Sequence, residues 1–207
     1  MEITMIGSLF IVAAPSGAGK TSLVNALVNK HNTIKLSVSH TTRASRDGEV
    51  EGQHYHFVEQ QKFAQMRDEG AFLESATVFD NSYGTSSEAV MSQLKQGYDV
   101  ILEIDWQGAQ QVRRNQPDCT SIFVLPPSKI DLELRLRDRG QDNDEIIARR
   151  MRDAEAEMSH YVEFDYLIIN DDFDEALVNL ESIITARRHS LAIQKQVQAD
   201  LLTELLA

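Results

Sequence analysis

A short glycine-rich segment, Ala14 to Thr21, constrains the fold of this chain more than any other feature. It reads Ala-Pro-Ser-Gly-Ala-Gly-Lys-Thr and follows the apolar run Ser8–Ala14, which is typical of a buried strand. Apolar residues at helical spacing begin just after Gly19. A strand, a glycine-rich turn and a helix in this order form a nest of backbone N–H groups at a helix N-terminus, where phosphate binds well. The sequence therefore predicts a phosphate-binding loop in an α/β fold.

Each position of this loop has an expected task. The strict pattern is Gly-x-x-x-x-Gly-Lys-Ser/Thr, and Ala14 takes the first glycine position, where a small residue still allows the tight turn. Lys20 is expected to reach the outer phosphates of a nucleotide, and Thr21 to place its hydroxyl on Mg²⁺. Asp105, which ends an apolar strand, is the expected second anchor for that ion, through water. The candidate nucleotide contacts are Ala14, Pro15, Ser16, Gly17, Ala18, Gly19, Lys20 and Thr21.

Short apolar runs alternate with helical periodicity along the rest of the chain, which indicates a doubly wound parallel sheet covered by helices. Further strands are expected at 34–39, 53–58, 72–77, 99–105, 120–125 and 166–169, with a turn at 80–84. Helices are expected at 59–69, 86–96, 128–161 with a break near Gly140, and 174–206. The predicted core comprises residues 1–35, 85–126 and 162–207, and two excursions, 36–84 and 127–161, leave it.

Charge and cysteine content narrow the partners and the compartment. The formal net charge of −12 and the pI near 4.9 oppose binding to nucleic acids and anionic membranes. The apolar run Leu9–Ala14 is too short to span a bilayer. Cys119 is the only cysteine, so no intrachain disulfide can form and a reducing cytoplasm is the expected location. Six of the 20 basic residues nevertheless lie within 135–152, which indicates a site for a small, highly charged anion.

A second polar segment, Ser39–Glu49, carries Arg43 and Arg46 three positions apart. Gly52-Gln53-His54-Tyr55-His56-Phe57, Phe72-Leu73-Glu74 and Asn81-Ser82-Tyr83-Gly84-Thr85 follow it, and then Asp105-Trp106-Gln107-Gly108 and Asn170-Asp171-Asp172. With these motifs in this order, the chain closely resembles guanylate kinases of the bacterial type, nucleoside monophosphate kinases with a P-loop NTPase fold. The resemblance runs from the phosphate loop to about Asp172.

This resemblance implies an enzyme that transfers the γ-phosphoryl group of ATP to GMP or dGMP, in purine nucleotide metabolism. It implies a parallel-sheet core with helices on both faces, in which 36–84 is a GMP-binding insertion and 127–161 a helical lid. Mg²⁺ is the implied cofactor. Because the accepting phosphate is already an anion, in-line transfer needs no general base and depends on alignment and charge neutralisation.

The resemblance also assigns residues to GMP. Arg43 and Arg46 are expected to clamp its phosphate, since forked guanidinium groups meet phosphate oxygens in pairs. Glu74 is expected to accept hydrogen bonds from guanine N1–H and the exocyclic amino group, which adenine cannot offer together. The full set expected at GMP is Ser39, Arg43, Arg46, Tyr55, Glu74, Tyr83, Thr85 and Glu103.

Arginines of the second excursion match the lid of the family. Arg139 and Arg150, eleven positions apart, are expected to close over the ATP phosphates and, with Lys20 and Arg43, to be catalytic. Arg135 and Arg152 are instead expected to pair with acids on a solvated helix face. Asn170 and Asp171 match positions that contact the adenine of ATP.

Other interpretations remain open at this point. Taken singly, the loop arginines suit surface ion pairs, the tyrosines suit packing, and Glu74 suits a solvated strand. A kinase for AMP or dTMP shares the same core. The guanylate-kinase-like modules of membrane scaffolds bind phosphopeptides but have typically lost the phosphate-loop lysine, which this chain keeps as Lys20. A GTPase switch is disfavoured because the chain has no Asn-Lys-x-Asp motif.

The oligomeric state is also open. The predicted C-terminal helix carries more apolar residues than a lone terminal helix needs, namely Ile184, Leu191, Val197, Leu201, Leu202 and Leu205. We expect it to pack either on the core or against a second subunit.

Overall fold

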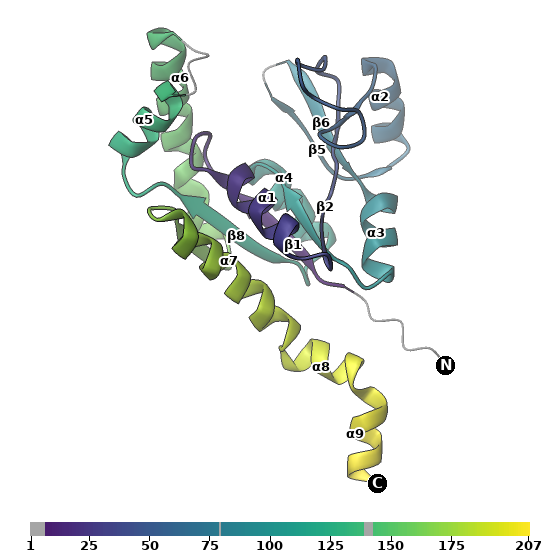
Figure 1. The fold of residues 1–207 in the computed structure, drawn as a ribbon. Helices are drawn as coiled ribbons and strands as arrows, with labels where there is room; N and C mark the ends of the chain where they lie inside the picture. Colours follow the sequence, from purple (N-terminus) through teal and green to yellow (C-terminus); the bar gives the residue numbers. More distant parts are fainter. Residues whose placement is uncertain (1–6, 79, 139–142) are drawn as a thin grey trace.

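A five-stranded parallel sheet forms the centre of the computed structural model, which describes residues 7–78, 80–138 and 143–207 (Figure 1). Its strand order is β2-β7-β1-β8-β9. The strands are β1 (Leu9–Ala13), β2 (Ile34–Leu36), β7 (Asp99–Glu103), β8 (Thr120–Leu125) and β9 (Tyr166–Ile169). Every pairing is parallel, so the carboxyl ends of the strands meet at one edge. The expected α/β architecture is confirmed.

Helices cover both faces of this sheet, which explains the unbroken apolar run of β1. Phe10 and Val12 face one cluster, with α1 (Lys20–Lys30) and α7 (Phe173–Arg188). Leu9 and Ile11 face the other, with α3 (Ser87–Lys95) and α4 (Trp106–Asn115). Successive side chains of a strand point to opposite faces, so a strand buried on both sides must be apolar throughout. Hydrophobic periodicity did not predict α4. The buried face of this helix has only one large apolar side chain, Val112, beside Gly108 and Ala109.

A second, four-stranded sheet belongs to the first excursion and stands beside the core. Its order is β4-β3-β6-β5, with β3 (His40–Thr41), β4 (His56–Phe57), β5 (Phe72–Val78) and β6 (Asn81–Ser86). The helix α2 (Gln60–Asp68) connects β4 to β5. In Figure 1 this sheet and the helices of the second excursion rise on opposite sides of the core.

Two local predictions in this excursion are wrong in part. Of the turn expected at 80–84, only Asp80 lies in a turn, with φ 66°. The other residues belong to strand β6, which pairs antiparallel with β5 along its whole length. Its polar sequence has no apolar alternation, so the neighbouring strand imposes the conformation. The strand expected over 53–58 is reduced to His56–Phe57, because Gly52 and His54 form turn hydrogen bonds to Tyr55 and Val50.

The second excursion contains α5 (Lys129–Asp138), α6 (Asp144–Met158) and the 3₁₀ helix η1 (Ser159–Glu163). A small cluster of Leu132, Leu136 and Ala154 holds the two helices together. The break expected near Gly140, and with it Arg139, lies outside the described residues.

The C-terminal segment is not one helix. After α7 the chain forms α8 (Leu191–Val197) and α9 (Ala199–Leu206), which lead away from the core (Figure 1). The break occurs at Ser190, whose backbone is extended (φ −60°, ψ 146°), although the apolar spacing continues through it. Leu191, Leu205 and Leu206 of this arm are exposed. Within residues 7–78, 80–138 and 143–207, no helix is both long enough and apolar enough to cross a membrane.

Candidate active site

The phosphate loop connects β1 to α1 through two glycines in left-handed conformations. Gly17 has φ 96° and Gly19 has φ 89°, values that favour glycine. Gly19 is the N-cap of α1 and has no side chain with which to cap it. The first N–H groups of α1 are thus available to an anion at the positive end of the helix dipole.

The loop is held in place by residues from two distant segments. The Asn170 side chain, buried at the end of β9, donates a 2.7 Å hydrogen bond to the carbonyl of Ala18. The guanidinium of Arg135, on α5, donates in turn to the Asn170 carbonyl at 2.9 Å. The expectation that Arg135 pairs with acids on a solvated face is therefore wrong, because α5 packs against the loop. A Cβ on Gly17 would lie only 2.9 Å from the side chain of Leu132 on the same helix.

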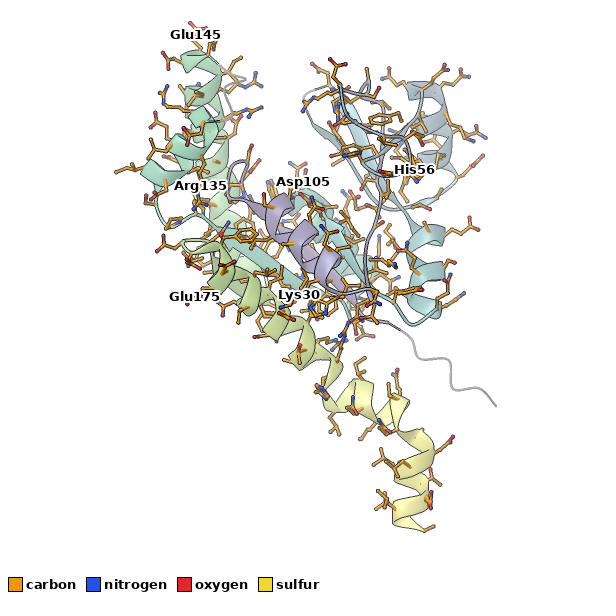
Figure 2. The ribbon with its side chains drawn as sticks, in the orientation of Figure 1. Lys30, His56, Asp105, Arg135, Glu145 and Glu175 are labelled. Atoms are coloured by element: carbon orange, nitrogen blue, oxygen red, sulfur yellow. The ribbon has the colours of Figure 1, made fainter. Side chains whose placement is uncertain are left out.

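Two cavities flank Lys20. One, of about 310 Å³, lies over the phosphate loop and is lined by Gly17, Thr21 and Trp106 among others. The other, of about 170 Å³, extends towards the second sheet. Both cavities are lined by Lys20, Glu103 and Asp105. Figure 2 shows Asp105 at this junction, between the second sheet and the helices α5 and α6. The Lys20 ammonium is fixed there by a 3.1 Å hydrogen bond to the Ile104 carbonyl.

Three carboxylates surround the loop cavity. The Thr21 hydroxyl donates to Glu103, and Asp105 caps α4 by accepting from the Gly108 N–H at 2.7 Å. Glu157 comes from α6 and accepts from the Ser16 N–H at 3.3 Å. Burial raises the pKa of Glu157, while the Ser16 N–H and the charge of Lys20 act in the opposite direction. Helix α6 thus places a carboxylate on a loop N–H that an anion could otherwise bind.

The second cavity ends at a buried carboxylate. Glu74 is only 4% exposed, and its Oε1 accepts a 2.6 Å hydrogen bond from the Thr85 hydroxyl. The Ser39 hydroxyl lies 3.3 Å from that of Thr85, so the three side chains form one connected group. Burial raises the pKa of Glu74 to about 7, with a smaller contribution from the negative charge of Asp105. The sheet pairing explains the grouping, since Glu74 on β5 faces Thr85 on β6.

At its other end the cavity is lined by two tyrosines that lie beside an arginine. The rings of Tyr55 and Tyr83 meet edge to face at 5.9 Å, and the guanidinium of Arg43 lies 5.4 Å from the Tyr55 ring. Arg43 also donates to Glu49 at 2.7 Å, and this contact lowers the pKa of Glu49 to about 2. The side chain of Arg46 is exposed, and its backbone N–H donates to the same Glu49.

Arg150 lies half-buried on α6 and is not among the residues that line the two cavities. Trp106, which lines the loop cavity, stacks on His160 of η1 with ring centroids 3.5 Å apart. His160 is held by Glu163 at 2.6 Å. Asp171, next to the buried Asn170, is exposed.

Sequence reasoning missed three residues of this site. Glu49 braces both arginines, Glu157 reaches the phosphate loop, and Gly108 lies against the carboxylate of Glu74. Glu49 lies three residues after Arg46 in the same loop, a spacing that could have suggested the pairing. The other two contacts join residues from distant segments, and no local pattern marks them.

Comparison with known proteins identifies the family of this chain. The sequence profile of the guanylate kinase family matches residues 7–187. A guanylate kinase of Alkalilimnicola ehrlichii is 57% identical over 98% of this chain and 100% of its own length. The guanylate kinase of Escherichia coli K12 is 57% identical over 97% of this chain and 98% of its own length. The crystal structure of guanylate kinase from Anaplasma phagocytophilum superposes with a TM-score of 0.75 at 31% identity, covering 91% of this chain and 89% of that one. The chain belongs to the guanylate kinase family.

Proposed function

We propose that this protein transfers the γ-phosphoryl group of ATP to GMP, and to dGMP, giving ADP and GDP or dGDP. The observation that carries the proposal is the pair of cavities that meet at Lys20, Glu103 and Asp105. A donor nucleotide over the phosphate loop and an acceptor in the second cavity would present their phosphates to each other at this junction. The family membership supports the same reaction.

We assign the acceptor cavity to GMP. The Glu74 carboxylate, supported by Thr85 and Ser39, would accept hydrogen bonds from guanine N1–H and its amino group. Adenine would present an acceptor to it instead, and a buried acceptor facing another acceptor is costly. The phosphate would lie between the Tyr55 and Tyr83 hydroxyls and the guanidinium groups of Arg43 and Arg46, with Glu49 fixing Arg43. Glu103 would contact the nucleotide where the two cavities meet.

ATP would occupy the loop cavity, its phosphates on the N–H groups from Ala14 to Thr21. Asn170 and Asp171 would lie near the adenine, in addition to the support that Asn170 gives to the loop. Arg150 and Arg139 would approach the transferring group when the lid closes, and this closure would exclude water as a competing acceptor. The protein would carry out this reaction in the cytoplasm, with no nucleic acid as a partner.

The oxygen ligands beside the loop suit Mg²⁺. Thr21, Glu103 and Asp105 supply a hydroxyl and two carboxylates, the hard oxygen donors that this ion prefers. Mg²⁺ usually takes one or two protein ligands and completes its shell with water and substrate phosphates. Thr21 would hold it directly and Asp105 through water, and it would neutralise charge on the β- and γ-phosphates.

The residues of the site act by alignment and charge. A phosphate oxygen of GMP attacks the γ-phosphorus of ATP in line, and the bond to the bridging oxygen of ADP breaks. The attacking oxygen carries no proton, so no general base is needed. Arg43 holds the attacking phosphate close despite its charge, and Lys20 stabilises charge on the transferring group.

A coupled ADP-release assay with MgATP and GMP, dGMP, AMP, CMP or UMP as the acceptor tests the proposal. We expect release with GMP and dGMP and little with the others. Equal rates with AMP, or no release with GMP, would contradict it.

Replacement of Arg43 by Lys tests the acceptor-phosphate site. Lysine keeps the charge but loses the fork that reaches Glu49 and the Ala44 carbonyl together. We expect the KM for GMP to rise about tenfold, as when one charge-assisted hydrogen bond of about 1.5 kcal/mol is lost, while the KM for ATP stays nearly constant. Arg67→Lys on the exposed face of α2 is the matched control. If the KM values for GMP and ATP change equally, Arg43 does not bind the phosphate of GMP.

We further propose that the C-terminal arm, α8 and α9, packs against a second copy of this chain. Leu206 is 85% exposed and Leu205 70%, on helices that lead away from their own core. Light scattering after size exclusion should give at least a dimer, and Leu205→Lys with Leu206→Lys should give a monomer. Glu204→Lys, an exposed polar site on the same helix, should leave the mass unchanged. A monomer at every concentration of the unaltered chain would refute this interface.

A further inference from the structure

Gly108 lies directly against the carboxylate of Glu74. It is the third residue of α4 and is buried, with its N–H bound by Asp105. A Cβ at this position would lie 2.9 Å from Glu74 Oε2 and 3.3 Å from its Cδ. A Cβ atom in a protein essentially never lies closer than 3.0 Å to such an atom, so a side chain at position 108 would force a movement.

The backbone itself does not require glycine at this position. Gly108 is not among the residues with positive φ and lies in regular helix, where alanine is more stable than glycine by about 0.5–1 kcal/mol. The requirement for glycine therefore comes from the space that the Glu74 carboxylate occupies.

The helix and the strand cannot easily move apart to relieve such a contact. Gln111 on α4 donates to the Ser75 carbonyl at 3.0 Å and accepts from the Ser75 N–H at 3.1 Å. Asn115 donates to the Leu73 carbonyl, also at 3.0 Å. These hydrogen bonds hold Leu73 and Ser75, the residues on either side of Glu74, against α4. The displacement would fall on the carboxylate, which is the flexible end of its side chain.

Displacement of the carboxylate has two consequences at the cavity. Its Oε1 is bound to Thr85 at 2.6 Å, so a shift of the group strains or breaks that bond. Oε2 would also leave the first turn of α4, whose positive dipole end favours a negative charge. Both effects change the position of the carboxylate oxygens that would accept hydrogen bonds from the nucleotide base. The packing of α4 remains intact.

We propose that Gly108 is a positioning residue for base selection: the absence of a side chain there lets the Glu74 carboxylate rest against α4 and fixes where the base of the acceptor nucleotide is read. This inference rests on the assignment of Glu74 to guanine in the proposed function. Gly108 itself touches no reacting atom.

The test is Gly108→Ala, assayed with GMP, AMP and ATP. We expect the KM for GMP to rise between about ten- and a hundredfold, the scale of a misplacement of roughly 1 Å. The kcat at saturating GMP and the KM for ATP should change little, and the preference for GMP over AMP should narrow. The melting temperature should stay constant or rise, because alanine favours the helix.

Gln107→Ala is the matched control, since Gln107 is exposed in the same turn of α4. It should leave the KM for GMP unchanged. An unchanged KM in Gly108→Ala, or equal losses for GMP and ATP, would overturn the inference.

A double-mutant cycle of Gly108→Ala and Glu74→Ala separates this inference from the proposed function. With the carboxylate removed, Gly108→Ala should cost nothing further for GMP. If Gly108→Ala alone unfolds the protein, the double variant should fold again, because the clashing group is gone. Additive losses in the cycle, or a double variant that stays unfolded, would overturn the positioning role. If Glu74→Ala alone leaves GMP selectivity intact, the assignment of Glu74 to guanine fails instead.

Discussion

Lys20→Ala is expected to lower the rate of phosphoryl transfer at least about a hundredfold, equivalent to about 3 kcal/mol of transition-state stabilisation. Lys20 lines both cavities, and its ammonium is already held at their junction by the Ile104 carbonyl. Charge develops there as the phosphoryl group moves, and methyl cannot replace the lost cation.

The fold should tolerate this change. Alanine is a good helix former at the start of α1, and the lost hydrogen bond to the Ile104 carbonyl is worth about 1 kcal/mol. Circular dichroism and thermal unfolding should therefore remain close to those of the unaltered protein. Lys30→Ala, at the exposed far end of the same helix, is the control and should retain full turnover. Near-normal turnover in purified Lys20→Ala would exclude the loop cavity as the donor site.

Glu74→Gln should reduce kcat/KM for GMP by about 2–3 kcal/mol, roughly thirty- to more than a hundredfold. Glutamine has the same size and can still accept from the Thr85 hydroxyl with its oxygen. Its amide nitrogen would then face the N1–H and amino group of guanine, donor against donor. The preference for GMP over AMP should narrow, while ATP binding, measured calorimetrically, should not change. Glu69→Gln, an exposed site after α2, is the control.

The same variant tests the ionisation of Glu74. Because the folded pKa of about 7 lies above the ordinary 4.5, the folded protein holds an extra proton between these values. Its stability should fall as pH rises through that window. In the proposed function GMP binds to the ionised form of Glu74, so kcat/KM for GMP should rise with pH through about 7. The phosphate of GMP also loses a proton near pH 6. In Glu74→Gln the pH profile of kcat/KM should keep only the step near pH 6. If the step near pH 7 persists in this variant, it belongs to a group other than Glu74.

If guanine selectivity survives in Glu74→Gln, the base is read elsewhere. Glu103 is the next candidate, because it lines the same cavity and is bound by the Thr21 hydroxyl. The corresponding Glu103→Gln variant distinguishes the two carboxylates.

The parts of this protein that were predictable from sequence are local. The phosphate loop is specified by its own glycines and by the strand and helix on either side, and strands β1, β7 and β8 of the central sheet each contain a continuous apolar run. The second sheet was harder to predict, since β6 is a polar segment that becomes a strand only because β5 lies beside it.

Tertiary contacts account for the remaining errors. Arg135 has the sequence context of a solvated helix residue, yet it reaches the Asn170 carbonyl 35 positions away. The apolar spacing of the C-terminal segment continues across Ser190, so periodicity alone could not locate the break. The grouping of Glu74 with Thr85 was accessible only through resemblance to a family, because the hairpin that unites them was not recognised.

The stacking of Trp106 on His160 gives the protein an intrinsic fluorescent probe. Trp106 is the only tryptophan of the chain, so all indole emission comes from one position at the wall of the loop cavity. Its stacking partner belongs to η1, which continues directly from α6. Any rearrangement of α6 and η1 relative to α4 therefore alters the surroundings of a single fluorophore. If nucleotide binding moves these helices, as the proposed function expects, stopped-flow fluorescence of the unlabelled enzyme can time that motion independently of the chemical step.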